Sequence, residues 1–553
     1  MVEGDAMRKN SERRFPDQLW PSDLIADPTA AARHLPPLAA AAVARGGPPR
    51  ELALGCAYLK ANLPPGICWI YACGTHSQAI AHIPEESAAA RLAGFVDVKA
   101  AEIGEFLGYR VISPQDLLNQ IFDYVIVGHL QYENDFADAL ISLGVPEEKI
   151  VRIYGGAAYR EPALAASVDK AAMQYAGPYD TIIVTSNSLV LSDSDLCEVF
   201  DREKTLVLYY GPRGQYTESP FPILNVHESL DFLYQLIEFY KPLNIYVRTF
   251  FDHDAIVYSI RQRRPDAIII HEPFDLSIVF PPELLTRWNK WSLEQIQALQ
   301  WAECDSFKTS DFIVSKRGGP CWDKIVAPFN TPFATVFSRL TRPELEEPAR
   351  ASGEDLRVVY AGFLPPETRH LGGYYDLYPC FEKLVRAAGV TVDIYNAGHL
   401  PGDYCDSVYD GYLSRDYGGK INYNRSLPYD LLIRQLMNYD FGWLYNERSE
   451  IYIHDAAVTI PGRVTGYISA GVPVIIDDEF EFLADLITRF NAGIVVPEGR
   501  TERIPELILN ADRPAMRAGT RRLRDYMFRQ NQEALSRLRN LMKHPHNPAA
   551  PED

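Results

Sequence analysis

The sequence lacks the features that mark membrane-spanning and disulfide-rich proteins. It has no run of about 18 apolar residues, and the alanine-rich tract at residues 36–44 is too short to cross a bilayer. The first 14 residues are polar and charged, so we expect no secretory signal. The eight cysteines form no C-x-x-C pair and no cluster with histidine, which favours reduced thiols in a cytoplasmic protein over disulfides or a zinc site.

Basic charge is also scarce. The chain has 54 Lys and Arg against 73 Asp and Glu, a formal net charge of −19. Because the phosphate backbone of a nucleic acid is bound by clusters of Lys and Arg, this composition argues against nucleic acid as a partner. The 47% hydrophobic and 23% charged fractions are those of globular domains. At 553 residues the chain is too long for one hydrophobic core, and three domains are the expected count.

After a lead-in segment at residues 1–50, residues 51–160 predict a small Rossmann-like α/β module. Strands are expected at residues 67–71, 94–97, 108–114, 124–128 and 150–154, with a helix near residues 136–143. The first strand runs into a turn and the second ends in Asp97, which is the order of a dinucleotide-binding unit. Of the three glycines typical of that turn only Gly74 is present, because Ala72 and Ser77 take the other two positions. A nucleotide or nucleotide-sugar pocket and a scaffold or partner-docking role both stay open for this module.

Residues 178–345 alternate strand-like and helix-like segments, which predicts a parallel sheet covered on both faces. Strands are expected at residues 180–184, 205–209, 244–247, 267–270, 312–314 and 324–326. Parallel sheets bind ligands beyond the carboxyl ends of their strands, so polar residues there are candidates for substrate contacts. Asp252 and Asp254 resemble a metal-binding D-x-D pair, but we expect them to open a helix and to hold no metal.

A second doubly wound pattern covers residues 355–512. The strand expected at residues 356–362 ends in Gly362, and further strands are expected at residues 390–395 and 439–444, with helices at residues 378–388 and 427–433. The sequence P-G-R-V-T-G-Y-I-S-A-G-V-P at residues 461–473 predicts a short helix that Pro461 opens and Gly471 ends, followed by a strand at residues 474–476. Helix N-termini bind phosphates through unused N–H groups and the helix dipole, and Arg463 falls in the first turn.

The stretch at residues 461–497, the segment at residues 427–444 and the segment at residues 303–315 together resemble GT-B glycosyltransferases of the group 1/family 4 type. The module at residues 66–155 resembles a Rossmann-like unit attached to several sugar-modifying enzymes and methyltransferases. The resemblance implies an α/β GT-B fold, in which two Rossmann-like doubly wound domains face a cleft, preceded by a third small Rossmann-like domain. Residues 178–345 would then be the acceptor domain and residues 355–512 the donor domain.

The resemblance also implies a set of site residues. Arg463 would be the catalytic residue, stabilising the diphosphate. The implied donor-binding residues are Gly362, Asn396, Gly462, Arg463, Val464, Thr465 and Tyr467. The implied acceptor-binding residues are Arg248, Asp252, His253, His271 and Glu272.

The implied reaction moves a sugar from a nucleotide-diphosphate donor to a glycan or protein acceptor, as in polysaccharide biosynthesis, without a metal or a further cofactor. Retaining members of the commonest type carry two glutamates eight residues apart, where this chain has Val458 and Gly466. Two alternatives therefore stay open: an inactive GT-B protein that binds a partner, and a nucleotide-sugar-modifying enzyme that uses the first module.

Residues 513–543 predict a long C-terminal helix with an apolar face and a basic face. In GT-B folds a terminal helix crosses back to the first domain, which is one interpretation of this segment. Contact of its basic face with a membrane surface is the other.

Overall fold

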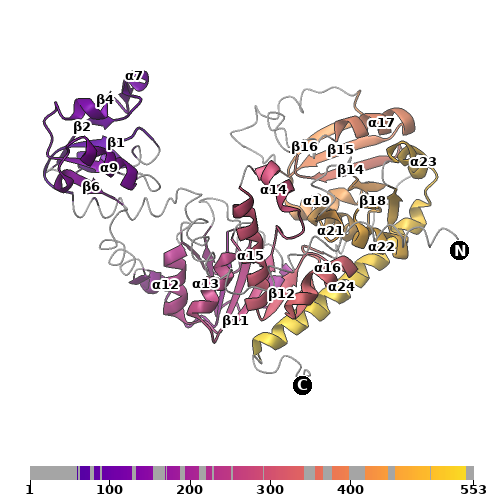
Figure 1. Cartoon of the computed structure of the whole chain (residues 1–553). Helices are drawn as coiled ribbons and strands as arrows, with labels where there is room; N and C mark the ends of the chain where they lie inside the picture. The colour runs from indigo at the N-terminus through magenta and orange to yellow at the C-terminus, as the bar shows by residue number, and fades with distance from the viewer. Residues whose placement is uncertain are drawn as a thin grey trace.

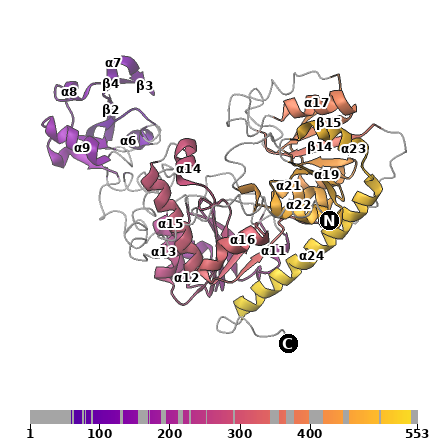
Figure 2. The ribbon, with the colours of Figure 1, turned by 45° about the vertical axis from the view of Figure 1, so that its right-hand side comes forward.

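The computed structural model describes residues 59, 63–74, 77, 80–86, 90–127, 133–153, 168–169, 171–186, 194–210, 219–226, 230–250, 253–289, 292–341, 355–364, 377–397, 418–445, 455–497 and 500–543. Three separate sheets, each almost wholly parallel, organise these residues. The module around the first sheet stands apart from the other two domains in both ribbon views (Figures 1 and 2). The expected lead-in at residues 1–50 lies outside the described residues. That the three predicted ranges fold independently stays a prediction.

The first sheet has the order β3-β4-β2-β1-β5-β6, and only the pairing of β3 with β4 is antiparallel. Side chains on both faces of β1 and β5 are buried, because helices and turns cover the two sides of this small sheet. Its strands are β1 Gly66–Tyr71, β2 Ala90–Val96, β3 Glu105–Phe106, β4 Tyr109–Ile112, β5 Tyr124–Val127 and β6 Ile150–Arg152. Its helices are α6 His82–Glu86, α7 Ala100–Ile103, α8 Pro114–Leu117 and α9 Glu133–Ser142.

The second sheet has the order β13-β12-β11-β10-β7-β8-β9, with all neighbours parallel. Its strands are β7 Thr181–Thr185, β8 Thr205–Tyr209, β9 Ile223–Asn225, β10 Asn244–Thr249, β11 Ile268–Pro273, β12 Phe312–Ser315 and β13 Phe333–Thr335. Its helices are α11 Ser194–Cys197, α12 Leu230–Tyr240, α13 Ala255–Arg263, α14 Pro282–Asn289, α15 Leu293–Thr309 and α16 Gly319–Val326.

One predicted strand in this domain is wrong. Residues 324–326 form the last turn of α16 instead of a strand. Ile325 and Val326 pack with Trp322 from the same helix in the core, so a short β-branched run here fills the buried face of a helix. A run of this length does not distinguish a buried strand from one turn of a buried helix. The outer strand of this edge is β13 instead.

The third sheet has the order β16-β15-β14-β17-β18-β19 and is parallel throughout. Its strands are β14 Arg357–Gly362, β15 Thr391–Asn396, β16 Ile421–Arg425, β17 Phe441–Trp443, β18 Val474–Asp477 and β19 Gly493–Val496. Its helices are α17 Tyr378–Ala388, α19 Tyr429–Leu436, α21 Gly462–Ser469, α22 Glu481–Phe490 and α23 Ile504–Leu509. Strand β16 is absent from the sequence predictions.

The long helix α24, Arg513–Lys543, packs against both large domains (Figures 1 and 2). Leu523 and Met527 belong to the core of the third sheet, whereas Leu535 and Leu538 belong to the core of the second. Between these two groups, Asn531 exchanges two hydrogen bonds with the backbone of Phe337. The helix therefore joins the two domains along its apolar face.

Several arginines on the basic face of α24 are used within the fold. Arg517, Arg522 and Arg524 donate hydrogen bonds to the backbone carbonyls of Tyr439, Phe490 and Ser469, respectively. These side chains bind carbonyl groups at the ends of neighbouring elements, which accounts for part of the basic pattern. Contact of this helix with a membrane surface stays a prediction. Among the helices in the described part of the chain, none is both long and apolar enough to span a bilayer.

A short backbone pairing ties the two large domains together. Arg317, two residues beyond β12, forms an antiparallel bridge with Thr459. Ile460 N–H donates to the Lys316 carbonyl at 3.1 Å, and Gly318 N–H donates to the Val458 carbonyl at 3.0 Å. The carboxyl end of β12 in the second sheet is thus fixed beside the chain that leads into α21.

Candidate functional site

The start of α21 lies at the carboxyl edge of the third sheet. Pro461 is the N-cap of the helix, and Gly462 is its first residue, so the predicted start is displaced by one residue. The reason is that the backbone of Pro461 is extended, with ψ 134°. Arg463 still falls in the first turn. Gly462 is exposed and Arg463 is half-buried, whereas every later residue of this helix is buried.

Arg463 lies beside the end of β14. Its guanidinium carbon is 5.0 Å from the centre of the Tyr360 ring. A Cβ placed on Gly362 would lie 3.4 Å from the same carbon and 3.0 Å from the Tyr360 hydroxyl. Two of the predicted donor-binding residues, Gly362 and Arg463, are therefore neighbours. The absence of a side chain on Gly362 leaves the guanidinium its room.

Tyr467 holds α21 against the sheet. Its hydroxyl accepts a hydrogen bond from Ala361 N–H at 2.9 Å and donates one to the Trp443 carbonyl at 3.2 Å. Burial raises the pKa of this hydroxyl. A Cβ on Gly442 would lie 2.4 Å from the Tyr467 ring, so only glycine allows strand β17 to approach so closely. Tyr467 is fully buried and its hydroxyl is occupied, which gives it a structural role.

Three further predicted donor residues are buried as well. Val464 is part of the core, and Thr465 bonds back to the Gly462 carbonyl at 2.7 Å. Asn396, paired with Gly362 in the sheet, exchanges two hydrogen bonds with the backbone of Leu364. These residues shape the helix and the loop after β14. That they contact a donor stays a prediction, and the surface of α21 itself offers Gly462 and Arg463.

On the second sheet, the predicted acceptor residues Arg248 and Glu272 lie opposite each other on β10 and β11. Both are fully buried. Arg248 Nε is 3.7 Å and Lys316 Nζ is 3.2 Å from the same Glu272 oxygen, and Tyr246 donates to the other oxygen at 2.7 Å. Burial alone would raise the pKa of Glu272, but Arg248, Lys316 and Tyr246 hold it below its usual value.

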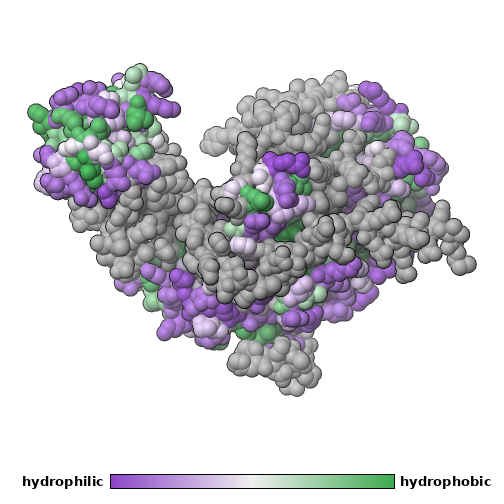
Figure 3. Space-filling model, viewed as in Figure 1, coloured by the Kyte–Doolittle hydropathy of each residue, from purple (hydrophilic) through white to green (hydrophobic). Residues whose placement is uncertain are grey.

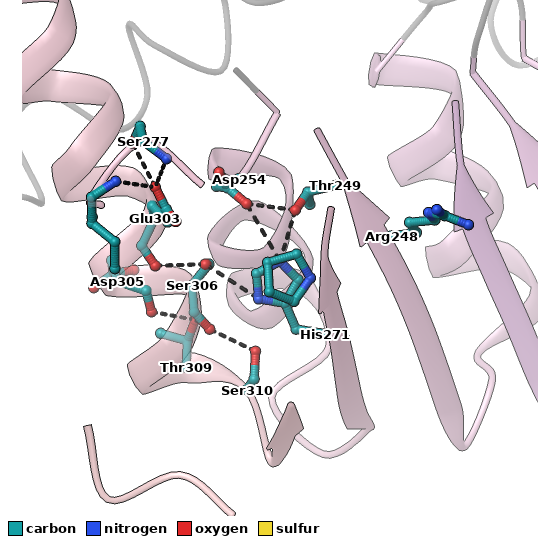
Figure 4. A network of polar contacts seen from close by, with 12 residues as sticks. Arg248, Thr249, Asp254, His271, Ser277, Glu303, Asp305, Ser306, Thr309 and Ser310 are labelled. Atoms are coloured by element: carbon teal, nitrogen blue, oxygen red, sulfur yellow. Dashed lines mark hydrogen bonds and ion pairs between the residues drawn. The ribbon is translucent and has the colours of Figure 1, made fainter. Parts of the chain in front are cut away.

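His271 belongs to a different network, on the other face of the sheet (Figure 4). Its Nε2 is 2.8 Å from the Thr249 hydroxyl and 3.4 Å from Asp254 Oδ1, and its Nδ1 is 3.4 Å from the Ser306 hydroxyl. Thr249 also donates to Asp254 at 2.5 Å. Figure 4 shows Arg248 apart from these bonds, on the neighbouring strand. His271 is fully buried as well.

The same face holds a buried glutamate that fixes a loop. Glu303 on α15 accepts hydrogen bonds from Ser277 N–H and hydroxyl, at 2.7 and 2.5 Å, and from Ile278 N–H at 3.1 Å (Figure 4). Burial, and then the nearby Asp254 carboxylate, raise the pKa of Glu303 to about 8. The loop that follows β11 is thereby bound to α15.

The last two predicted acceptor residues precede α13. His253 packs against Tyr210 with ring centres 5.3 Å apart. Asp252 lies outside the described residues. The N-cap of α13 is Asp254, and its side chain makes no capping bond because it faces Thr249 and His271. That these residues bind an acceptor stays a prediction.

Asp275 belongs to the stretch 271–275, which the sequence places beyond the carboxyl end of a strand, but it is not among the acceptor-binding residues that the resemblance implies. It follows β11 by two residues and is the only exposed residue between residues 267 and 280. Burial by the surrounding protein is nevertheless the largest influence on its pKa, which rises to about 6. A carboxylate that solvent reaches but that protein surrounds lies in a recess. Its position beyond the carboxyl end of a strand indicates a possible ligand contact, but His271 and Glu272 lie at the same strand end and are indicated equally.

In the first module, the glycine-poor turn after β1 is hydrogen-bonded to Asp97, the acid that follows β2. Asp97 accepts hydrogen bonds from Cys73 N–H and from Lys99 N–H, both at 2.9 Å. Ala72 adopts φ 76°, in the left-handed region. Burial, with Asp97 next, raises the pKa of the Cys73 thiol to about 11, so the thiol stays protonated at neutral pH. The carboxylate that would hold a ribose in a dinucleotide site instead caps the loop.

The first module also carries large hydrophobic side chains on its surface, and Figure 3 shows hydrophobic patches on the visible face of this part of the molecule. The exposed side chains include Val98, Leu107, Leu118 and Ile121, with exposed fractions of 76%, 46%, 48% and 84%. Exposed apolar residues of this kind are compatible with the docking alternative for the module. Within the described residues, no group of three or more His, Cys, Asp and Glu is arranged to hold a metal ion.

Comparison with known proteins gives a family match for the first module and distant structural matches over about two thirds of the chain. Residues 68–151 match the family described as C2185-like, N-terminal. No curated protein matches the chain. Among solved structures, the lipopolysaccharide outer core galactosyltransferase WaaB in its apo form is similar at 12% identity and a TM-score of 0.42, over 64% of this chain and 99% of that one.

Two further solved structures are similar at comparable distance. A glycosyltransferase from Rickettsia africae matches at 10% identity and a TM-score of 0.42, over 66% of this chain and 98% of that one. MurG from Acinetobacter baumannii matches at 7% identity and a TM-score of 0.38, over 66% and 99%. The two parallel sheets β7–β13 and β14–β19, joined by a backbone pairing and by α24, give this chain a GT-B fold.

Proposed function

We propose that this protein is a glycosyltransferase that moves a sugar from a nucleotide-diphosphate donor to a hydroxyl group of a glycan or protein acceptor, without a metal ion. The observation that carries the proposal is the position of Arg463. It lies in the first turn of α21 and beside Gly362 at the end of β14. A helix N-terminus and a guanidinium at the carboxyl edge of a parallel sheet form a place for a diphosphate.

The chemistry follows from where charge develops. When the bond between the sugar and the diphosphate breaks, the leaving group gains negative charge. The N–H groups in the first turn of α21 and the Arg463 guanidinium would stabilise that charge more in the transition state than in the bound donor. Arg binds two phosphate oxygens at once, which suits a diphosphate. In this proposal these donors supply the stabilisation that a metal ion gives in other enzymes.

The second sheet would supply the acceptor side. Lys316 is bonded through its backbone carbonyl to Ile460, one residue before the N-cap of α21. Its side chain, with Arg248 and Glu272, forms a charged group on the carboxyl edge of the second sheet. The two carboxyl edges therefore meet next to the proposed diphosphate position. An acceptor bound there would approach the sugar from the second domain.

The alternative enzyme, in which the first module modifies a nucleotide sugar, is disfavoured by Asp97. Its carboxylate is used by the loop that would contact the cofactor diphosphate. An inactive protein that only binds a partner is the other alternative, and the experiment below separates it from a transferase. A cytoplasmic location remains part of the proposal.

The test has two parts. Isothermal titration of the full chain with UDP, GDP and ADP is expected to show saturable binding of at least one diphosphate. A panel of nucleotide sugars is then incubated with the protein, and release of the diphosphate is measured. Binding with release supports the transferase. Binding without release from any donor supports the inactive alternative, and the absence of binding to all three diphosphates removes the proposed function.

A further inference from the structure

The loop after β11 presents a single carboxylate to solvent. Across residues 267–280 every side chain except that of Asp275 is buried or half-buried. Its neighbours in the chain, Pro273, Leu276 and Ser277, are all buried. Among the described residues, no hydrogen bond or ion pair occupies the Asp275 carboxylate. The fold therefore buries a loop and leaves one acidic group of it accessible.

This loop is held on both sides of Asp275. On the amino side, the Pro273 carbonyl accepts a hydrogen bond from Arg317 at 3.3 Å, and Phe274 N–H donates to the Thr249 carbonyl at 3.1 Å. On the carboxyl side, Glu303 accepts three hydrogen bonds from Ser277 and Ile278 (Figure 4).

Gln300 adds two further bonds, to the Ser277 and Phe280 carbonyls, both at 3.0 Å. Each of these anchors is buried, so solvent does not compete for them. The position of the Asp275 main chain is therefore fixed by bonds from β10, α15 and the segment after β12. A side chain on such a support is preorganised for a reaction in the way that a surface-loop carboxylate is not.

Charged groups from both large domains surround Asp275. Burial raises its pKa most, Arg317 and Arg248 lower it, and Asp455 and Asp254 raise it, with a net pKa of about 6. Arg248 comes from β10, Asp254 caps α13, and Arg317 follows β12. Asp455 belongs to the third-sheet domain and bonds to Arg317 at 3.3 Å. Asp275 thus lies where the two domains meet.

The same contacts place Asp275 near the proposed donor position. Arg317 is bonded to the carbonyl two residues before Asp275 and is paired with Thr459. Thr459 is followed by Ile460 and by Pro461, the N-cap of α21. One arginine therefore connects the loop of Asp275 to the chain that enters the proposed diphosphate cradle.

We propose that Asp275 is the proton acceptor for the attacking hydroxyl group, an inference that rests on the proposed function. The acceptor hydroxyl gives its proton to an Asp275 carboxylate oxygen. The hydroxyl oxygen forms a bond to the anomeric carbon of the donor sugar. The bond from that carbon to the diphosphate oxygen breaks, and its electron pair leaves with the nucleoside diphosphate at α21. This single displacement inverts the anomeric configuration.

The protonation state of Asp275 suits this role. A proton acceptor works when it is ionised, and it is most effective when its pKa is close to the working pH. With a pKa of about 6, Asp275 is ionised at neutral pH and binds a proton more strongly than an ordinary aspartate. The rate should therefore rise with pH through about 6 and level off above it.

The experiment measures diphosphate release from the donor found in the nucleotide-sugar panel, with water as the acceptor, for the wild type, Asp275→Asn and Asp266→Asn. Asp266 is the matched control, because it precedes β11 as Asp275 follows it, and its side chain is 72% exposed. We expect Asp275→Asn to lower kcat about 10²–10⁴-fold and to remove the rise near pH 6, with the donor KM changed less than about threefold. Asp266→Asn should behave as the wild type.

Two outcomes would overturn the proposal. They are an Asp275→Asn rate within about threefold of the wild type, and a product that keeps the anomeric configuration of the donor in NMR spectra. Diphosphate titration of Asp275→Asn checks the fold of the site, and an unchanged Kd is expected. A wild type that binds no diphosphate, or that binds it but releases none from any donor, contradicts the proposed function instead, so the two failures are distinguishable.

Discussion

Two regions of this molecule resemble nucleotide-binding units in sequence, and the structure treats them differently. In the first module, the turn after β1 is followed by an acid at the end of β2, and that acid binds the turn itself through Cys73 N–H. In the third domain, Pro461 caps a helix whose first turn holds Gly462 and Arg463 near the surface, beside Gly362. One region uses its polar groups internally, and the other presents them.

The difference shows that the number of glycines in a turn indicates nucleotide binding less well than whether its N–H groups are already hydrogen-bonded. Each oxygen of the Asp97 carboxylate already accepts one backbone N–H, so part of its hydrogen-bonding capacity is used within the module. At α21 the preceding residue is a proline, so no side-chain oxygen caps the helix. The sequence order strand, turn, helix, acid therefore does not by itself distinguish a nucleotide-binding turn from a self-capped loop.

Removing Arg463 is expected to have the largest effect, because it tests directly whether the start of α21 binds the diphosphate. Arg463→Ala should cost on the order of 2–4 kcal/mol of transition-state stabilisation, the size seen when one preorganised donor is removed, while the melting temperature stays close to that of the wild type. Arg463→Lys should recover part of the loss, because lysine keeps the charge but not the bidentate geometry. Diphosphate release from the donor and diphosphate affinity are the measurements.

Arg386 on α17 is the matched control for Arg463. Its side chain is 82% exposed and makes one weak pair with Glu382, so Arg386→Ala should leave release and affinity unchanged. Equal activity and affinity in Arg463→Ala and the wild type would remove Arg463 from the site. The proposed diphosphate position at α21 would then lose its main support.

A second variant addresses the other half of the comparison. Asp97→Ala removes the acceptor of two backbone N–H groups, and we expect it to destabilise the first module by about 1–3 kcal/mol. Diphosphate affinity should not change, because the proposed site lies elsewhere. Hydrogen exchange of the β1 and β5 amides measures the first effect, with the exposed Glu148→Ala as control. Loss of diphosphate binding in Asp97→Ala would move the site to the first module.

A third variant, Glu303→Gln, tests the protonation state of the buried glutamate that holds the loop after β11. The folded chain holds the Glu303 pKa near 8, above its ordinary value of 4.5, so folding takes up a proton between these pH values. The contribution of Glu303 to stability is therefore greatest below about pH 4.5 and is lost as the pH rises to about 8. Urea unfolding of the wild type and Glu303→Gln should show the wild type losing stability relative to the variant over this window.

The exposed Glu283→Gln, on the neighbouring helix α14, is the control for Glu303. Its difference from the wild type should stay constant with pH. If the difference in free energy of unfolding between the wild type and Glu303→Gln is also constant with pH, the Glu303 carboxyl group is ionised in the folded chain. The hydrogen bonds from Ser277 and Ile278 would then be made to a carboxylate.

The smallest effect is expected from removing the first module. The predicted linker near residues 160–179 separates two complete α/β patterns, so a chain that starts near residue 170 should fold and bind diphosphate with the affinity of the full chain. Limited proteolysis should give a stable fragment of this extent. A fragment that fails to fold, or that loses affinity, would show that the first module supports the site.

The sequence predicts the main elements of this fold well, because strands and helices here have strong local signals. The alternation of apolar segments places the central strands of all three sheets, but it misses β9, β13 and β16, which lie at or near the sheet edges. Pro461 places α21 within one residue. The failure at residues 324–326 has a local cause: the β-branched pair Ile325 and Val326 fits the buried face of a helix equally well.

The candidate site is less predictable, because burial at the strand ends depends on distant elements. His271 and Glu272 are covered because α15, Lys316 and Arg248 pack over them, and those contacts span 24 to 44 residues of sequence. Asp275 differs from its neighbours only in staying exposed. Tyr467 is a similar case. Its position in the helix is predicted, but the hydrogen bonds of its hydroxyl to β14 and β17 are not.

The central claim is that the diphosphate binds at the first turn of α21 and not at the turn after β1. Hydrogen–deuterium exchange of the full chain, with and without the nucleoside diphosphate that binds most tightly, tests it directly. We predict slower exchange at Gly462, Arg463 and Val464 in the presence of the diphosphate, and no change at Cys73 and Gly74. Slower exchange at Cys73 and Gly74, with none at residues 462–464, would contradict the account.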